Sequence, residues 1–187
     1  MTSKATAFEL QPILEGKLLR LRPLRAEDFD DLYAVASDPL IWEQHPAKER
    51  AEREGFLKFF QKALDTRGAL VAIDRRDGRV VGTSRYHDLD ERNSEIEIGY
   101  TFLARSLWGS GHNREMKELM LRHAFGFVER VVFTVDPNNL RSQRAVEKIG
   151  GVRMGTRMNC EGRDSVLFQI TAAEFEQNFA RGDKPAV

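Results

Sequence analysis

The sequence predicts a mixed α/β fold, with one mostly antiparallel sheet and helices on both of its faces. Runs of strand length alternate along the chain with stretches whose apolar residues recur at the 3.6-residue period of a helix. Asp77-Gly78 joins two β-rich runs, which is a strong hairpin signal. Residues 131–135 form a continuous apolar run, typical of a strand buried on both faces. The order β, α, α, β, β, β, α, β, α, β, β therefore contains one βαβ unit, in the second half.

In the first half of the chain we expect three strands and two helices. Leucines and arginines alternate over residues 16–22, as in a half-buried strand. Acidic residues open a helix at 26–37, where they suit the positive end of the helix dipole. A second helix is expected at 47–66, because its apolar residues share one face. The hairpin strands are expected at 69–74 and 79–86.

The second half is expected to hold four more strands and two more helices. The strands cover residues 95–103, 131–135, 152–159 and 165–170, and the helices cover residues 111–128 and 141–149. Gly150-Gly151 suits the end of the second of these helices. We expect one domain over residues 1–187, with its core at about residues 13–175, a frayed start and a loose tail at 180–187.

The composition is that of a globular protein in water, with 41% hydrophobic and 31% charged residues. Lys plus Arg (29) balances Asp plus Glu (29), so the chain lacks the basic excess of a nucleic-acid binder. No apolar run approaches the roughly 20 residues of a membrane-spanning helix. The first ten residues lack the apolar segment of a signal peptide. We therefore expect a cytoplasmic protein that binds neither nucleic acid nor a membrane.

The cysteine and histidine content predicts no metal site. A single cysteine, Cys160, excludes an intrachain disulfide and a Cys-based zinc site. No pair of the four histidines has metal-ligand spacing on one helix. His87 follows a strand and is expected to be exposed, and His123 is expected to be structural.

Residues 108–114 (WGSGHNR) are the most informative stretch, because they lie between a predicted strand and a predicted helix. Glycines there let the backbone turn sharply, and the helix start offers N–H groups and a partial positive charge. This combination binds a phosphate or pyrophosphate. The alternative is that Gly109 and Gly111 only make a tight turn. A dinucleotide fingerprint is excluded because Arg114 stands where its third glycine would be, and no Gly-Lys-Ser/Thr tripeptide of a Walker A loop exists.

Residues 135–142 (VDPNNLRS) form a second constellation. Asn139 and Ser142 lie where a buried strand ends and a helix begins, at the same end of the sheet as the glycine loop. The alternative is that Asn138 or Asn139 only caps the helix, which stabilises it by about 1 kcal/mol.

Taken together, these segments resemble the GNAT superfamily of acyl-CoA N-acyltransferases, and within it the ribosomal-protein alanine N-acetyltransferases (RimJ/RimL-like). The resemblance covers about residues 13–175. It rests on the strand containing Ile98-Gly99-Tyr100, on the loop Trp108 to Gly111, and on the block from Asn139, Arg141 and Ser142 to Lys148-Ile149-Gly150. Residues 41–46 (IWEQHP) also look like a segment that borders the acceptor pocket in some members.

The resemblance implies a site for acetyl-CoA between strands 95–103 and 131–135. The pantetheine arm would lie where these strands separate, and the pyrophosphate would lie on the amides of the glycine loop. Asn139 would bond the pantetheine, and Ser142 would lie close to the thioester sulfur. The implied cofactor-binding residues are Tyr100, Thr101, Phe102, Leu103, Trp108, Gly109, Ser110, Gly111, His112, Asn113, Asn139 and Ser142. Trp42 and His45 would contact the acceptor substrate.

Two features depart from the family pattern. Asn113 stands where the phosphate loop of the family has Gly or Ala. The helix after strand 131–135 has no tyrosine to protonate the leaving thiolate, because the only tyrosines are Tyr33, Tyr86 and Tyr100. Ser142 is therefore the expected proton donor.

The expected chemistry is direct attack of an amine on a thioester in a ternary complex. Positioning both substrates in one cleft supplies several kcal/mol. The general base is expected to be Glu97 or Glu95, which alternate with Ile96 and Ile98 on strand 95–103. The alternative for either glutamate is a solvated carboxylate without a catalytic role.

The leading hypothesis is an acetyl-CoA-dependent N-acetyltransferase that acts on a protein N-terminus or a small amine. A non-catalytic acyl-CoA-binding regulatory module is the alternative, which the two departures keep open. A nucleotide-binding domain of another class is disfavoured by the missing fingerprints. The acceptor stays open, because similar folds serve many amines. The oligomeric state also stays open, with a homodimer as the expectation.

Overall fold

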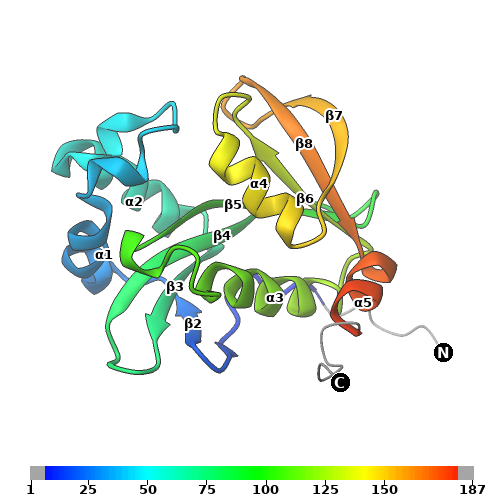
Figure 1. Ribbon diagram of the computed structural model, residues 1–187, viewed down its shortest axis with the longest axis horizontal. Coiled ribbons are helices and arrows are strands. Elements are labelled where there is room, and N and C mark those ends of the chain that lie inside the picture. The colour runs from blue at the N-terminus through cyan, green and yellow to red at the C-terminus, as the bar shows by residue number, and fades with distance from the viewer. Residues whose placement is uncertain (1–6, 181–187) are drawn as a thin grey trace.

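The protein is built on one eight-stranded sheet, which the computed structural model describes together with its helices over residues 7–180. The strands are β1 (Leu14–Glu15), β2 (Leu19–Pro23), β3 (Ala69–Asp74), β4 (Val80–Asp90), β5 (Glu95–Leu103), β6 (Arg130–Val135), β7 (Val152–Met158) and β8 (Asp164–Thr171). Their spatial order is β1-β2-β3-β4-β5-β6-β8-β7. Only β5 and β6 run parallel, and α3 connects them. The predicted mixed, mostly antiparallel sheet with one βαβ unit is confirmed (Figure 1).

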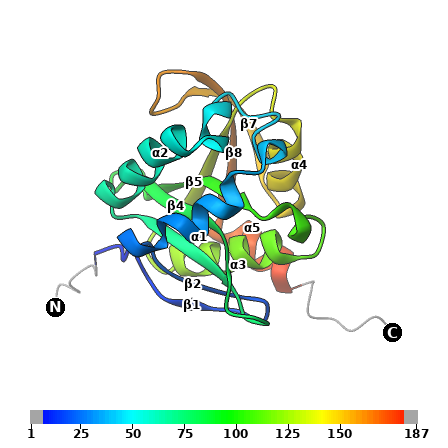
Figure 2. The ribbon, with the colours of Figure 1, turned by 90° about the vertical axis from the view of Figure 1, so that its left-hand side faces the viewer.

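Helices cover the sheet over two separate hydrophobic clusters. The helices are α1 (Phe29–Ala36), α2 (Arg53–Asp65), α3 (His112–Ala124), α4 (Leu140–Lys148) and α5 (Ala172–Ala180). Buried side chains of α1 and α2 form one cluster with β3 and Phe102. Those of α3, α4 and α5 form the other cluster with strands from β2 to β8. Figure 2 looks onto the side where α1 and α2 lie together.

Most predicted elements occur where the periodicity places them. The strands at 69–74 and 95–103 match β3 and β5 residue for residue, and the predicted strand at 79–86 extends to Asp90. The predicted helix at 47–66 divides into a 3-10 turn at Lys48–Ala51 and α2. The predicted helix at 111–128 ends at Ala124, and residues 125–128 form the turn into β6.

The sequence analysis missed α5. Its first turn is capped by Thr171 and Glu174: the Glu174 amide donates to Thr171 Oγ1, and the Thr171 amide donates to Glu174 Oε2. This reciprocal pair is the capping box Thr-x-x-Glu, so the local signal was present. Phe175 then anchors the helix in the core.

Two expectations meet the limits of the described residues. The frayed start, and all of the predicted loose tail except Ala180, lie outside residues 7–180. Within that range, none of the helices combines the length and the apolar character that crossing a bilayer requires.

Candidate active site

The two parallel strands of the sheet separate after a short contact. β5 pairs with β6 only from Glu95↔Arg130 to Glu97↔Val132, although β5 continues to Leu103 and β6 to Val135. Figure 1 shows β5 then running toward α1 and α2 while β6 runs toward α4. In the described residues, the edge of β5 that faces β6 therefore has no strand partner from Ile98 onward. Backbone polar groups along that edge are available to a ligand.

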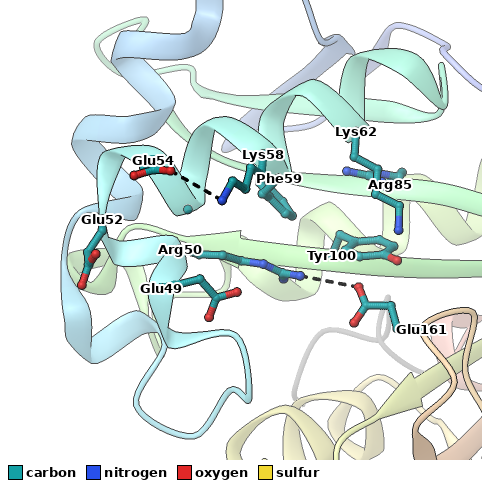
Figure 3. A pocket seen from close by; sticks show the side chains of 11 residues that line it. Glu49, Arg50, Glu52, Glu54, Lys58, Phe59, Lys62, Arg85, Tyr100 and Glu161 are labelled. Atoms are coloured by element: carbon teal, nitrogen blue, oxygen red, sulfur yellow. Dashed lines mark ion pairs between the residues drawn. The ribbon is translucent and has the colours of Figure 1, made fainter.

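A β-bulge lies in β5 where this separation begins. Phe102 pairs with Thr83 and Gly99 with Arg85, so Tyr100 and Thr101 together lie opposite the single residue Ser84. Tyr100 has a φ of 53°, in the left-handed region that non-glycine residues seldom adopt. Bulges of this kind re-aim a side chain and end regular pairing. Here the bulge points the Tyr100 ring into a cavity (Figure 3).

The glycine loop ends in the first turn of α3, as predicted. Gly109 and Gly111 have φ values of 77° and 89°, which favour glycine at both positions. Gly111 is the N-cap of α3 and contributes no side-chain cap. The first N–H groups of a helix have no acceptor within it, so those of His112 and Asn113 point out of the helix end. The loop has the geometry of an anion site, and its role in binding stays a prediction.

The His112 side chain turns into the protein. His112 is 4% exposed; its Nδ1 lies 2.8 Å from Ser110 Oγ, and its Nε2 lies 3.8 Å from Asp74 Oδ2. Hydrogen bonds from Arg76 lower the pKa of Asp74 to about 2, so Asp74 is a stable anion beside the imidazole. The His112 side chain is therefore engaged inside the protein, and only its backbone N–H is left for a ligand at the glycine loop.

Asn139 and Ser142 lie together at the first turn of α4. Asn139 is the N-cap, and its Oδ1 accepts from the Ser142 amide at 3.1 Å. The predicted capping role of Asn139 is therefore present, and its side-chain NH2 remains available as a donor. The Ser142 hydroxyl has no hydrogen bond within the described residues and is half-buried. The structure thus gives this hydroxyl no structural task.

Arg141 joins three parts of the site, which the sequence analysis did not predict. Its guanidinium donates to the carbonyls of Leu40 and Ile41, and its backbone N–H donates to Gln44 Oε1. Its guanidinium carbon also lies 4.2 Å from the centre of the Trp108 ring. The start of α4, the residues before α2 and the glycine loop are thereby connected.

Glu97 lies at the point where β5 and β6 separate. Its Oε1 accepts from the amide of Thr134 at 3.2 Å and from the Thr134 hydroxyl. Glu97 is 6% exposed, so the alternative of a solvated carboxylate is wrong for this residue. Glu95 instead forms ion pairs with Arg157 and Arg130 at 2.7 and 3.8 Å.

His87 was expected to be exposed, and this prediction is wrong. Its side chain is 10% exposed because it packs on Gly99, where a Cβ atom would lie 2.6 Å from His87 Nε2. That Nε2 is buried without a hydrogen bond and lies 3.8 Å from Glu97 Oε1. The His87 imidazole thus lies beside the Glu97 carboxylate on one face of the sheet.

A cavity of about 450 Å³ opens on the α2 side of the sheet. Arg50 and Phe59 line it from the 3-10 turn and α2, Arg85 and Tyr100 from β4 and β5, and Glu161 from the turn between β7 and β8. Figure 3 shows Arg85 and Tyr100 at one end and Glu49, Glu52 and Glu54 toward the other. Burial, followed by the hydrogen bond to Cys160, raises the pKa of Tyr100, so its hydroxyl is protonated at neutral pH.

Trp42 and His45 are not among the residues that line this cavity. Trp42 is 4% exposed, donates to the Ala36 carbonyl at 2.7 Å and packs on Phe102. His45 accepts from the Ala47 amide. Burial, and next the positive charge of Arg50, lower the pKa of His45 to about 4. Their predicted contact with the acceptor is not tested by this placement.

One group in the described residues has the composition of a metal site. Donor atoms of His87, Asp88 and Cys160 all lie within 4.8 Å of one another. Structural zinc sites have four ligands, and Asp88 and Cys160 are exposed. The expected absence of a metal stays a prediction.

Comparison with known proteins gives a family match. Residues 19–152 match the family described as acetyltransferase (GNAT) domain. The chain is similar to the Bacillus subtilis protein named "Uncharacterized N-acetyltransferase YoaA". The identity is 26% over 151 residues, which are 77% of this chain and 85% of the relative.

Solved structures have the same fold. The solved structure described as "Crystal structure of putative acetyltransferase" is 30% identical with a TM-score of 0.77, and the match covers 94% of this chain and 93% of that one. The RimJ protein of Mycobacterium smegmatis, in complex with CoA-disulfide, is 22% identical with a TM-score of 0.63. That match covers 88% of this chain and 89% of the other, and at this identity it shows the fold alone.

Proposed function

The chain belongs to the GNAT family of acetyltransferases, and from this premise we propose that it transfers acetyl groups from acetyl-CoA to a primary amine by direct attack in a ternary complex. The family match supports the leading hypothesis from the sequence, an acetyltransferase enzyme, over the alternative of a non-catalytic module. The amine and the roles of individual residues are the parts proposed here.

The separation of β5 from β6 carries the proposal. It leaves the edge of β5 from Ile98 to Leu103 without a strand partner, which suits the amide groups of a pantetheine arm, although the Leu103 carbonyl already accepts from Trp108 Nε1 at 3.2 Å. The glycine loop, with Gly111 at the start of α3, suits the pyrophosphate of the same ligand. Asn139 borders the gap from β6 and α4 with its side-chain NH2 available. The fold of the M. smegmatis RimJ, which has been crystallised with CoA-disulfide, is similar.

Acetyl-CoA supplies the activated acetyl group, and three groups of this chain would serve the transfer. Glu97, with His87 beside it, takes the proton of the attacking amine. Backbone N–H groups of the bulged part of β5 polarise the thioester carbonyl. The Ser142 hydroxyl, which has no structural bond in the described residues, donates a proton toward the departing thiolate.

The acceptor would enter through the cavity between α2 and β5. That cavity is lined by Tyr100 of the bulge, so it reaches the strand on which the thioester would lie. A protein N-terminus and a small amine are both compatible with an opening of about 450 Å³.

The proposal is tested by supplying the purified protein with acetyl-CoA and a panel of amines, including short peptides, amino acids and polyamines. We expect release of free thiol that depends on the amine, and an acetylated product by mass spectrometry. Double-reciprocal plots that intersect support a ternary complex. Parallel plots, with an acetylated protein isolated in the absence of amine, contradict direct attack.

A further inference from the structure

We infer that the acceptor carries a carboxylate close to its amino group, as a free amino acid does, and that Arg85 binds this carboxylate with Arg50 beside it. This inference rests on the proposed function, because it assigns a substrate class to the same cavity. Two guanidinium groups, those of Arg85 and Arg50, are buried, and the described residues compensate their charges poorly.

Arg85 is a buried cation that forms no salt bridge in the described residues. The residue is 2% exposed, and its Nε is buried without a hydrogen bond. Within residues 7–180 its guanidinium has no ion-pair partner; it packs instead against two rings, 4.3 Å from the centre of Tyr100 and 5.6 Å from that of Phe59. Burying an unpaired charge is costly, so buried charges are normally paired. The planar donor fork of arginine matches a carboxylate in a bidentate pair.

Arg50 adds a second positive charge against the same rings. Its guanidinium carbon lies 4.8 Å from the centre of Phe59 and 5.9 Å from that of Tyr100. Arg50 is 9% exposed, and the one ion pair that it forms within residues 7–180, to Glu161, is long at 3.6 Å. Burial is the main reason why the pKa values of Arg50 and Arg85 are lowered. An anion bound between the guanidinium groups of Arg50 and Arg85 would compensate both buried charges.

The remaining charges orient such an anion. Glu49, Glu52 and Glu54 lie toward the other end of the cavity (Figure 3), where they disfavour a negative group. Lys58 is paired with Glu54 at 3.6 Å and is exposed. At the end formed by β4 and β5, Lys62 adds to the positive charges of Arg85 and Arg50, and Glu161 is the carboxylate among the lining residues there (Figure 3), so the anion is expected at that end.

Strand register places Arg85 close to the proposed general base. Arg85 pairs with Gly99 and His87 pairs with Glu97, so Arg85 and Glu97 lie on one face of adjacent strands, two residues apart along them. Two residues of strand span about 7 Å. We therefore expect a carboxylate held by Arg85 to leave the amine of the neighbouring carbon on the side of the Glu97–His87 pair. An α-amino acid has this short separation, whereas a protein N-terminus offers no carboxylate there unless a side chain supplies one.

The test compares matched acceptors at saturating acetyl-CoA. All twenty amino acids are supplied with their α-carboxamides, and for leucine and phenylalanine the decarboxylated amines isoamylamine and phenethylamine are added. We expect kcat/KM for the best amino acid to exceed that of its carboxamide by about 100-fold, the discrimination expected when a buried ionic partner is removed. The amine of the carboxamide is less basic than that of the amino acid, so a larger fraction of it is in the neutral, reactive form. A preference for the acid therefore cannot come from amine basicity.

Variants then assign the preference to the arginine. Arg85→Gln is expected to lower kcat/KM for the amino acid about 100-fold and to leave that for the carboxamide and the KM for acetyl-CoA unchanged. Arg85→Lys should restore part of the preference. Arg53→Gln is the matched control. Arg53 of α2 also packs on two rings, at 4.8 Å from the centre of Phe29 and 5.5 Å from that of Tyr33 on α1, but it does not line the cavity.

The outcomes separate this inference from the proposed function. If amines are acetylated but carboxamides or decarboxylated amines react as well as the acids, the inference is overturned while the acetyltransferase assignment stands. Acetylation of peptide N-termini alone also overturns it. If acetyl-CoA yields no thiol with any amine, both are overturned. If Arg85→Gln does not fold, the comparison of acid with carboxamide on the unaltered protein still decides.

Discussion

The guanidinium carbon of Arg141 lies 4.2 Å from the centre of the Trp108 ring, so the first turn of α4 contacts the glycine loop directly. The same guanidinium donates to the carbonyls of Leu40 and Ile41. Two loops that border the proposed acetyl-CoA site are therefore held by one side chain. Stacking on an indole contributes about 0.5–1 kcal/mol at exposed sites, and hydrogen bonds from a charged donor contribute about 1.5–3 kcal/mol.

Arg141→Met is therefore expected to raise the KM for acetyl-CoA about tenfold, since the loop loses about 1.4 kcal/mol of support for its binding geometry. The melting temperature should fall by several degrees. Arg144→Met, at an exposed arginine of the same helix, is the control and should match the parent. An unchanged KM in a destabilised Arg141→Met protein would limit Arg141 to a purely structural role.

Gly111→Val tests the proposed pyrophosphate site. The φ of Gly111 is 89°, and an added Cβ would meet only Leu18, at 3.8 Å, so the protein has room but the backbone is strained by about 1–3 kcal/mol. We expect calorimetry to show CoA binding weakened at least tenfold, because the helix start must shift. Gly78→Val is the matched control: its φ is 73°, its surroundings are open, and it lies in the turn between β3 and β4. Equal CoA affinity in both folded variants would contradict a ligand at Gly111.

Glu97→Gln tests the general base. The amide keeps an oxygen for the Thr134 hydroxyl and amide, so the fold should be retained. Loss of a general base typically costs about 100-fold or more in turnover. Glu95→Gln provides the comparison on the same strand face, where the carboxylate is paired with Arg157 and Arg130. A larger loss in Glu95→Gln than in Glu97→Gln would transfer the role to Glu95.

Lys117 makes the stability of the fold depend on pH. It is buried beneath Ser84 and Thr101, whose hydroxyls accept from its Nζ, and burial lowers its pKa to about 7. A lysine of the unfolded chain has a pKa near 10.4, so between about pH 7 and pH 10 the unfolded state binds more protons than the fold. Stability due to this residue therefore rises with pH across that window and is constant below it.

Thermal melts of the parent and of Lys117→Met from pH 6 to pH 10 should show this slope. The parent gains melting temperature relative to Lys117→Met as the pH rises above 7. A difference between the two proteins that stays constant over the whole range would mean that Lys117 titrates as an ordinary lysine.

The fold could be predicted from the sequence where the local pattern of apolar residues reflects which side chains are buried. β3 and β5 were placed correctly because their apolar residues alternate or run together, and the glycine loop because its residue types are needed at a helix start. Contacts between residues that lie far apart in the sequence could not be predicted in this way. His87 is covered because Gly99 of the next strand lets it pack closely, and no pattern near residue 87 records that.

The arginines of the cavity were missed for the same reason. Arg85 lies within the β-rich run 79–86, where a buried charge was a detectable signal, but its two aromatic neighbours come from α2 and from the bulge in β5. Arg50 lies in a charged stretch and carries no local signal at all. Site residues implied by the family resemblance concern acetyl-CoA, whereas the acceptor side is built from contacts that only the folded chain brings together.

Ser142→Ala tests the source of the proton for the departing thiolate. The serine hydroxyl has no hydrogen bond in the described residues, whereas its backbone N–H is held by Asn139 and is kept in the variant. The melting temperature should therefore stay at that of the parent. A serine hydroxyl is a poor acid and solvent can replace it, so turnover is expected to fall about tenfold, or about 1.4 kcal/mol.

This modest effect must be separated from changes in binding and product release. The KM for acetyl-CoA should stay unchanged, and Ser142→Thr, which keeps the hydroxyl, should recover most of the turnover. The comparison is made in single-turnover experiments, so that acetyl transfer itself is observed. Equal single-turnover rates for the parent and Ser142→Ala would assign the proton to water, and a lowered melting temperature with unchanged transfer would give Ser142 a structural role.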